Sequence, residues 1–559
     1  MEKIKRTIQS VWDALKSWEG DAQIRYRLLV FPAVLGAVLL ILSTSWGAGV
    51  GGDAAIYISS AKNLLSGKGL GWIEADGSFR LLPYTPPFYP LVLSLAGLFG
   101  IDLTVSARWL NVLFFSGLIF GCALSIYRVT SRTWLASLAG LIIAFSPVLL
   151  GVEVWAMSEG LFLLLTYLTL ALILMYLLYS KSSYLWSAGV VAGLAFLTRY
   201  IGASIVATGV VSLLFMYQNP MKRRLRDVFW FGIIALLPVA IWGGISVLMT
   251  GTLSSRSAQP VSAFWLRFLE MGKPLLEIYL FWFFPGSLIS RLPEVLKVIF
   301  VFSSLTMFIA WGGMLWRKKA VHQEAERTSD WLLAGVFVLF ILCYLAVLTV
   351  VQVFTYPPVT LASRMLSPVH LTVIILVTIL AHLTLKNWQG IKFVPWLTGL
   401  FFLVFLGSYI FRGTLVVRDF QREGIGYTGR AWQQSRVIHE VRKLPGNVPL
   451  VTNDVTAVYY LTGRSAYPMQ EIYAQKPLER FTVFGEDSSD PGQVVFRQYG
   501  AALVLFDSIR DDLAYYGDRL DERLAVLTKG LYLYYPSEEG WIYFYQEPAF
   551  LSECGTCKK

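Results

Sequence analysis

The stretch STSWGAGVGGDAAIYISSAKNLLSGKG, from Ser43 to Gly69, marks where the chain leaves its first long apolar run. The run ends at Trp46, four glycines follow within six residues, and Asp53 then opens a segment with helical spacing of apolar residues. If the run spans a membrane, this carboxylate stands at the membrane surface. The stretch therefore bears both on the fold class and on where chemistry takes place.

The composition places the chain in a membrane. Of its 559 residues, 56% are hydrophobic and only 15% are charged, which is too apolar for a soluble protein of this size. The abundant Trp, Tyr and Phe are typical of side chains at membrane interfaces. Apolar runs of about 20 residues, the length that crosses a bilayer, recur along the chain. Eleven candidate spans fall near residues 28–48, 107–127, 134–154, 159–179, 184–200, 201–217, 227–249, 295–316, 330–352, 366–385 and 394–412.

Basic residues predict the orientation of these spans. The net charge of +11 is spread over the loops at every second junction, which favours control of topology over binding of nucleic acid. If these loops are cytoplasmic, the N-terminus is inside and everything after Arg412 is outside. We expect a multi-pass protein of the plasma (inner) membrane in three parts. These are an amphipathic cytoplasmic N-terminus (1–27), a membrane domain (28–412) with a long first outer loop (49–106), and an extracytoplasmic domain (413–559).

The first outer loop is expected to hold two interfacial helices. Residues 53–65 place Ala, Tyr, Ile and Leu on one broad face and Ser59, Lys62 and Asn63 opposite, the pattern of a helix that lies along a membrane. Gly67 is a plausible C-cap for it. The prolines of RLLPYTPPFYP then forbid a continuous helix, and the apolar residues after them are too few for an easy crossing.

The C-terminal part reads as a small α/β domain. VPLVTND, AALVLFDS and GWIYFYQ predict strands, AWQQSRVIHEVRKLPG predicts a helix, and DERLAVLTKG predicts a helix that enters a strand. No nucleotide-binding or nucleophile motif occurs in it. Cys554 and Cys557 form CGTC, but no second Cys or His pair accompanies them, so a metal site is not favoured.

This organisation resembles the GT-C superfamily of integral-membrane glycosyltransferases. The similarity is greatest to the branch of protein O-mannosyltransferases and the lipid A aminoarabinose transferase. GGDAAIYISSAKNLLSGKG matches the branch pattern D-x-x-x-Y-x-x-x-A-x-x-L-x-x-G-x-G, and YTPPFYP matches its PP-x-Y-P stretch. GLAFLTRYIG and ASRMLSPVHL are similar to two further Arg-containing stretches of these enzymes.

The resemblance implies an α-helical polytopic fold and a sugar transfer, with inversion, at the outer membrane face. The donor would be a polyprenyl phosphate or pyrophosphate sugar, and the Asp of the first outer loop, here Asp53, would be the catalytic carboxylate. Members of the lipid A branch carry Lys directly before the Pro-Pro pair, where this chain has Thr85. The departure argues against an aminoarabinose donor, and Arg80 or Arg199 would have to supply the missing charge.

The chemistry of the reaction assigns roles to the candidate residues. Inversion needs one carboxylate to deprotonate the acceptor hydroxyl and cations to stabilise the leaving phosphate. Asp53 suits the first role, although it would equally serve as the N-cap of its helix. Glu159 is the second catalytic candidate, with Glu153 as a nearby competitor, because relatives often carry an acid there.

Arginines near the ends of spans are the candidates for the donor phosphate, because guanidinium groups match phosphate geometry. They are Arg199, Arg364 and Arg80, and each would otherwise be a side chain that reaches from a span to water. Three aromatic residues of the first outer loop are expected to line the substrate site: Tyr57, Tyr84 and Tyr89.

No set of His, Asp or Cys residues has the spacing of metal ligands, and the lone Asp53 argues mildly against a metal. A divalent cation stays open, because relatives with pyrophosphate donors use one. The expected partners are a polyprenyl-linked donor and a lipid, glycan or protein acceptor. Two other functions stay open: a polytopic transporter or flippase, and a non-catalytic GT-C homologue. No inverted repeat is visible and the charges lie at the ends of spans, which favours the enzyme.

Overall fold

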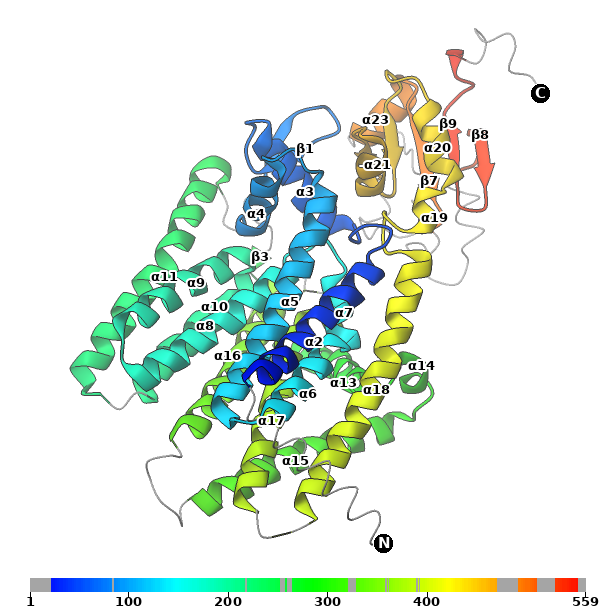
Figure 1. The fold of residues 1–559 in the computed structure, drawn as a ribbon. Helices are drawn as coiled ribbons and strands as arrows, with labels where there is room; N and C mark the ends of the chain where they lie inside the picture. Colours follow the sequence, from blue (N-terminus) through cyan, green and yellow to red (C-terminus); the bar gives the residue numbers. More distant parts are fainter. Residues whose placement is uncertain are drawn as a thin grey trace. The chain divides into compact units, whose positions relative to one another are not determined.

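The computed structural model is mainly helical (Figure 1). It describes residues 22–82, 85–216, 219–251, 257–258, 264–319, 328–356, 359, 361–388, 391, 393–469, 491–509 and 528–550. The chain divides into two compact units that are each discontinuous in sequence. Unit 1 consists of Met1–Ser45 and Pro83–Arg422, and unit 2 consists of Trp46–Leu82 and Glu423–Lys559.

Unit 1 carries the helices that are long and apolar enough to cross a membrane. Over the part of the chain that is described, eight helices meet this criterion alone. They are α2 (Ala22–Ser43), α5 (Leu103–Thr130), α8 (Glu159–Tyr179), α11 (Met221–Thr250), α15 (Glu294–Lys319), α16 (Thr328–Phe354), α17 (Ser367–Asn387) and α18 (Val394–Glu423). A bent pair, α6 (Thr133–Ala144) and α7 (Pro147–Glu153), makes a ninth if the two count as one span; their axes differ by 57°.

All eleven apolar runs of the sequence fall on helices. The runs near 184–200 and 201–217 correspond to α9 (Ser182–Thr198) and α10 (Ala203–Phe215), which are shorter than the other spans and are separated by the 3-10 turn η1 (Tyr200–Gly202). A multi-pass helical fold is thus confirmed, whereas eleven separate crossings remain a prediction. The predicted amphipathic N-terminus lies almost wholly outside the described residues, since α2 begins at Ala22.

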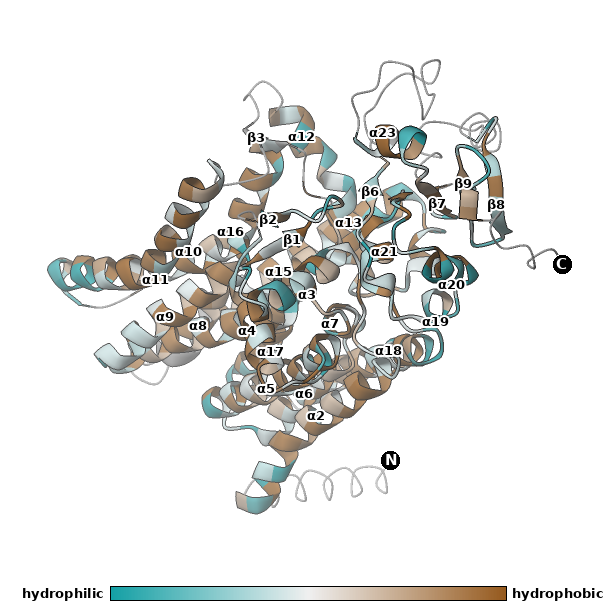
Figure 2. Cartoon of the chain, turned by 90° about the horizontal axis from the view of Figure 1, so that it is seen from above, coloured by the Kyte–Doolittle hydropathy of each residue, from teal (hydrophilic) through white to brown (hydrophobic). Residues whose placement is uncertain are grey.

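Helix α17 is the centre of unit 1. In its most apolar window 83% of the residues are buried, against 6% in α15, so α17 packs on all sides while α15 leaves most of its surface exposed. Figure 2 shows the apolar colour running along these helices. Small residues let neighbouring helices approach closely. A side chain at Gly140 of α6 would lie 2.9 Å from Pro32 of α2, so only glycine fits at this crossing.

The remaining elements of unit 1 are short. Helix α4 (Phe88–Gly97) is the second helix expected in the first outer loop, and η3 (Ser363–Leu366) is a 3-10 turn directly before α17. The aromatic segment before α15 folds into α12 (Phe264–Glu270), α13 (Gly272–Phe281) and α14 (Gly286–Ile289), and the two-residue strands β3 (Ser257–Ala258) and β4 (Thr355–Tyr356) pair antiparallel.

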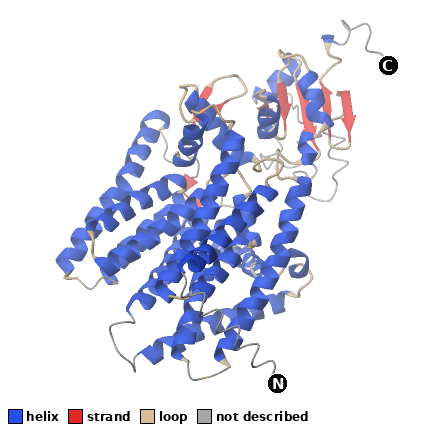
Figure 3. Cartoon of the chain, viewed as in Figure 1, coloured by secondary structure: helices blue, strands red, loops and turns tan. Residues whose placement is uncertain are grey.

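Unit 2 is built on a mixed five-stranded sheet, drawn red in Figure 3. The strand order is β6 (Tyr467–Pro468), β5 (Leu450–Thr452), β7 (Ala502–Phe506), β9 (Gly540–Phe544) and β8 (Tyr532–Ser537). Strand β5 runs parallel to β6 and β7, and the remaining pairs are antiparallel. In the described part of residues 423–559, four helices accompany the sheet: α19 (Arg430–Gln433), α20 (Arg436–Lys443), α21 (Val455–Thr462) and α23 (Pro491–Gln498).

The three strands expected from the sequence are confirmed as β5, β7 and β9. The expected helix of 431–446 is divided into α19 and α20, because Ser435 acts as an N-cap and accepts a hydrogen bond from the Ile438 amide at 3.4 Å. Most of the segment DERLAVLTKG, and both cysteines of CGTC, lie outside the described residues.

The boundary of the C-terminal domain differs from the prediction at 413. Helix α18 continues to Glu423, because no proline interrupts the polar end of the segment and the first left-handed residue is Gly424, with φ +69°. The domain also includes residues 46–82, which hold α3 (Gly52–Leu65), β1 (Gly71–Ile73) and β2 (Phe79–Leu81). The loop with Asp53 is therefore part of the same compact unit as the C-terminal sheet.

Helix α3 buries two of the three polar residues that the sequence assigned to water, whereas Lys62 is exposed. Ser59 and Asn63 are buried, while the apolar Leu65 is 38% exposed. The reason is a polar contact: the Asn63 side-chain amide donates to the carbonyl of Gly71 on β1 at 2.8 Å. Gly67, with φ +78°, follows the end of the helix as expected.

Candidate active site

A buried carboxylate and two guanidinium groups meet in unit 1, at the ends of three separate helices. Glu159 is the first residue of α8, and its side chain is 4% exposed. Its Oε1 atom lies 2.6 Å from Nη1 of Arg199 and 3.7 Å from Nη1 of Arg364. The structure thus brings together three of the residues singled out in the sequence, which are 40 to 205 positions apart in the chain.

Arg199 stands at a break in the helical path. It ends α9 and precedes η1, with extended backbone angles of φ −151° and ψ 131°. Gly202 permits this tight reversal, because a Cβ there would lie 2.6 Å from the Phe196 Cα. The guanidinium of Arg199 also donates to the Ser158 hydroxyl at 3.3 Å, so it is held by two successive residues at the start of α8.

Arg364 lies on the 3-10 turn η3 and is the most accessible member of the group. Its side chain is 40% exposed, compared with 18% for Arg199. Nη1 of Arg364 contacts the sulfur of Met157 at 3.2 Å. The buried hydroxyl of Tyr344 on α16 donates to the carbonyl of Met365, next to Arg364. Tyr344 was missed in the sequence because it lies in an uninterrupted apolar run with no local signal.

This arrangement is suited to an anion. The two guanidinium groups contact one carboxylate, and Arg364 keeps a large part of its surface open. Each guanidinium carries five N–H donors in a planar fork that matches the oxygens of a phosphate. The side chain of Glu159 is almost completely buried beside both arginines, and its predicted catalytic role stays a prediction.

Glu153, the competitor of Glu159 in the sequence, is completely buried at the end of α7. Among the residues that the structure describes, its carboxylate oxygens have no hydrogen-bond partner. Gly160 makes room for them: a Cβ at this position would lie 2.3 Å from Oε2 of Glu153. The turn between α7 and α8 is fixed by Asn111, whose amide donates to the carbonyls of Glu153 at 2.8 Å and Trp155 at 2.7 Å.

Asp53 lies in unit 2, in the first turn of α3. The N-cap position of the helix is held by Gly51, and the carboxylate, one residue after the first helical residue, is on an exposed residue. An acidic residue in the first turn favours the helix dipole, but the capping position itself belongs to glycine. The alternative that Asp53 serves as the N-cap is therefore wrong.

The other predicted residues have mixed outcomes. Arg80 on β2 forms an exposed ion pair with Glu74 at 3.2 Å across the β1–β2 hairpin, and it belongs to unit 2, whereas Arg199 belongs to unit 1. Tyr57 is half-buried on α3, and Tyr84 lies outside the described residues. Tyr89 on α4 is completely buried, and its place in the lining of a substrate site stays a prediction.

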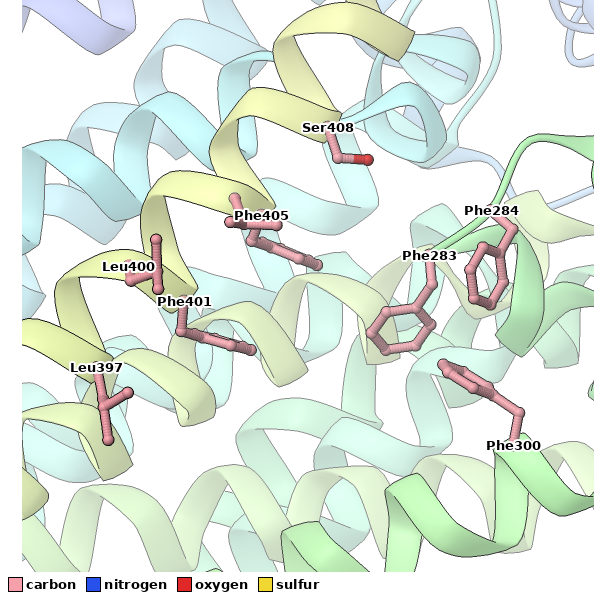
Figure 4. Close-up of a pocket in the computed structure, with 9 residues that line it drawn as sticks. Phe283, Phe284, Phe300, Leu397, Leu400, Phe401, Phe405 and Ser408 are labelled. Carbon is pink, nitrogen blue, oxygen red and sulfur yellow. The ribbon is translucent and has the colours of Figure 1, made fainter.

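Unit 1 also has an apolar hollow of about 500 Å³ between the α13–α14 connection, α15 and α18 (Figure 4). Phe283 and Phe405 face each other across it, with ring centroids 6.3 Å apart. Its lining residues are Phe283, Phe284, Phe300, Leu397, Leu400, Phe401, Val404, Phe405 and Ser408. Ser408 is the one polar residue of this lining. The hollow is therefore suited to a hydrocarbon chain, and its lining offers no acid, base or nucleophile for catalysis.

No group of three or more His, Cys, Asp or Glu side chains with metal-binding geometry occurs in the described segments. The charged groups of the candidate site are therefore arginines and carboxylates. Whether a divalent cation takes part in the reaction stays an open expectation.

Comparisons with known proteins give a fold. No family profile matches the sequence, and no curated protein matches it. Among solved structures, ArnT from Cupriavidus metallidurans in the apo state aligns with a TM-score of 0.53 at 14% identity, over 94% of this chain and 99% of that chain. The structure of ArnT bound to undecaprenyl phosphate aligns with a TM-score of 0.52 at 12% identity, over 93% and 98% of the two chains.

ArnT is a lipid A aminoarabinose transferase with a GT-C fold, the branch that the sequence motifs indicated. At this level of identity the likeness is one of fold, and it extends over both units of the chain. The chain therefore has the fold of the GT-C membrane glycosyltransferases, as its resemblance to them implied.

Proposed function

We propose that this protein is a membrane glycosyltransferase that moves a sugar from a polyprenyl phosphate or pyrophosphate donor to an acceptor hydroxyl. The observation that carries the proposal is the contact of Glu159 with Arg199 and Arg364 at three helix ends. A phosphate site of this kind is what a lipid-phosphate donor requires. The fold supports the proposal, because ArnT, which shares it, has been crystallised with undecaprenyl phosphate.

In the proposed reaction Asp53 is the general base. Its carboxylate takes the proton of the acceptor hydroxyl, whose oxygen attacks the anomeric carbon of the donor sugar. The bond between that carbon and the phosphate oxygen breaks, and the configuration inverts because attack and departure take place on opposite faces. The electron pair stays with the polyprenyl phosphate, which gains one negative charge. No covalent sugar–enzyme intermediate is needed.

Arg199 and Arg364 have the role of stabilising that charge. Donors aimed at developing charge in a water-poor site are among the largest contributions to catalysis. Glu159 is a positioning residue in this scheme: it holds Arg199 at 2.6 Å and thereby sets the direction of the guanidinium. The exposed part of Arg364 is the surface on which the phosphate would rest.

The donor differs from that of ArnT in this proposal. Thr85 stands where the lipid A branch has Lys, so the contact from that Lys to the donor is lost. We therefore expect a neutral hexose or pentose rather than aminoarabinose. Lipid, glycan and protein hydroxyls all remain acceptors compatible with the scheme.

Orientation follows from the basic loops. The N-terminus is placed in the cytoplasm and unit 2 outside, so that Asp53 works at the outer face of the membrane. Lipid carriers keep their phosphate at the membrane surface while the polyprenyl tail stays in hydrocarbon, and the proposed reaction takes place at that surface.

Transfer by the purified full-length protein tests the proposal. The protein in lipid nanodiscs is given polyprenyl phosphate and pyrophosphate carriers with labelled hexoses or pentoses, and envelope lipid and glycan fractions as acceptors. Label should leave the carrier for an acceptor with at least one donor, and parallel reactions with EDTA reveal any need for a divalent cation. If no donor gives transfer and the unmodified carrier moves across the bilayer, the glycosyltransferase proposal is wrong and the protein is a flippase.

A further inference from the structure

The segment before Asp53 pairs with the chain that enters the C-terminal sheet. Val50 and Gly426 form an isolated parallel β-bridge. The amide of Tyr427 donates to the Val50 carbonyl at 2.7 Å, and the Thr428 hydroxyl donates to the Ala48 carbonyl at 3.0 Å. We call these two segments, residues 46–53 and 424–428, the loop seam. All of it belongs to unit 2.

The glycines of the sequence GIGYTG allow the two backbone segments of the seam to come close together. Gly424 and Gly426 have φ of +69° and +58°, which side chains disfavour. A Cβ on Gly424 would lie 2.6 Å from the Cα of Gly429 and 3.2 Å from the side chain of Trp46. The backbone of 424–428 therefore comes within contact of the first residues after the α2 span.

The side chain of Tyr427 anchors the seam in the α/β domain. Its hydroxyl lies 2.9 and 3.1 Å from the two oxygens of Asp454 and 2.8 Å from the hydroxyl of Thr456. Asp454 is the N-cap of α21 and accepts from the Ala457 amide at 2.9 Å. Tyr427 is only 8% exposed and Asp454 and Thr456 are half-buried, so this is a partly buried polar network in which each member holds the others.

The network lies beside the start of α3, because α21 packs against α3. A Cβ placed on Gly52 would come 4.0 Å from the Thr456 hydroxyl, so Thr456 lies close to the residue before Asp53. A second contact holds the far end of the loop: Trp72 on β1 packs against Tyr459 on α21, with ring centroids 4.5 Å apart. Helix α3 is thus fixed to α21 at its start and through its hairpin.

We propose that Tyr427, with Asp454 and Thr456, is a positioning residue for Asp53. The proposal rests on the proposed function of Asp53 as the base. Four glycines in the six residues before Asp53 make this segment costly to order. The seam holds this segment in place through the hydrogen bonds of Tyr427 with Val50 and of Thr428 with Ala48. The α/β domain is therefore a structural part of the catalytic element rather than only a cover or an acceptor-binding module.

The test compares Tyr427→Phe with Tyr532→Phe, a matched change on the edge strand β8. Tyr427→Phe keeps the ring, which packs edge-on against Trp432 at 5.2 Å, and removes only the hydroxyl. Hydrogen exchange of the amides in 47–56 should become faster in Tyr427→Phe and stay unchanged in Tyr532→Phe. The value of kcat should fall about 10- to 100-fold, as expected for a displaced catalytic group, while KM for the donor stays within about twofold.

Thr456→Val is the second variant, in case Tyr427→Phe does not fold, and Thr456→Ser should restore activity because it returns the hydroxyl. Unchanged exchange in 47–56, or unchanged kcat in Tyr427→Phe while Asp53→Asn is inactive, overturns the positioning role. Full activity of Asp53→Asn instead shows that the proposed function itself has failed. The two failures are therefore distinguishable.

Discussion

Arg199 and Arg364 share one carboxylate, yet their surroundings differ. Arg199 contacts Glu159 at 2.6 Å and Ser158 at 3.3 Å, whereas Arg364 lies 3.7 Å from Glu159 and is more than twice as exposed. The Arg364 side chain is thus more accessible to a solute than the Arg199 side chain. In the proposed function, Arg199 mainly orders the site and Arg364 mainly contacts the donor phosphate.

This difference gives a prediction for binding. Arg364→Ala should weaken binding of polyprenyl phosphate about tenfold or more, and Arg364→Lys should restore only part of it, because one ammonium replaces a planar fork. The measurement is a titration of purified protein with the undecaprenyl carrier. Arg418→Ala, a change of the same kind on α18, is the control. Equal affinity in wild type and Arg364→Ala would reduce Arg364 to an interface anchor.

At the scale of elements, the site depends on how helices end. Glu159 begins α8 after a turn held by Asn111, Arg199 occupies the break between α9 and η1, and Arg364 lies on the 3-10 turn before α17. Helix termini expose unpaired backbone groups and permit abrupt changes of direction. Charged side chains from different spans meet at such ends without interrupting the apolar faces of the helices.

The junction of α7 and α8 provides a stability test with a matched pair of glycines. Gly160→Ala would force a methyl group to within 2.3 Å of the buried Glu153 carboxylate, and overpacking of this kind costs about 1–3 kcal/mol. Gly151→Ala on α7 meets nothing within 4 Å and should be neutral or stabilising by up to about 1 kcal/mol. Thermal unfolding of both variants in the same detergent measures the difference. If Gly160→Ala is as stable as Gly151→Ala, Glu153 is not confined by Gly160.

The sequence was informative about elements that depend on local pattern. Every long apolar run is a helix, and three strands of the C-terminal sheet follow alternating or buried apolar segments. It was wrong about α3, where Ser59 and Asn63 turn inward, because a tertiary hydrogen bond to Gly71 outweighs the apolar pattern of the helix. It also missed Tyr344 and Tyr427, whose roles come from contacts with residues remote in the chain.

The candidate site was partly predictable for the same reason. Glu159, Arg199 and Arg364 stand out in the sequence because they lie at predicted outer ends of apolar runs, in places where the GT-C resemblance implies charged residues. Which of them touch is a tertiary fact that no local pattern contains. The seam is the clearest case: nothing near Val50 in the sequence indicates that it pairs with Gly426.

At the scale of the whole molecule, the chain leaves unit 1 at Ser45, forms part of unit 2, and returns at Pro83 before it enters unit 2 for a second time at Glu423. If unit 2 is extracytoplasmic, both of its chain segments, residues 46–82 and 423–559, must be on the outer side of the membrane. The basic loops predict the outer side for both.

Accessibility to protease tests this topology. In intact cells or spheroplasts, a protease added outside should cleave residues of 423–559, and a tag fused at the C-terminus should be lost from the membrane fraction. A tag at the N-terminus should be protected until the membrane is broken. Cleavage of the C-terminal region only in inverted vesicles would reverse the orientation and move the proposed chemistry to the cytoplasmic face.

The central claim is that Asp53 is the base of a sugar transfer, and one comparison tests it most directly. Asp53→Asn and Asp76→Asn are made in the full-length protein and assayed for transfer from the polyprenyl-linked donor. Both are the same change in the same loop, and Asp76 only closes the β1–β2 turn by accepting from the Ser78 amide at 2.8 Å. We predict that Asp53→Asn folds, binds donor and loses about 10²- to 10⁴-fold in rate, whereas Asp76→Asn keeps near wild-type activity. A folded Asp53→Asn that binds donor and transfers sugar as fast as Asp76→Asn would contradict the account.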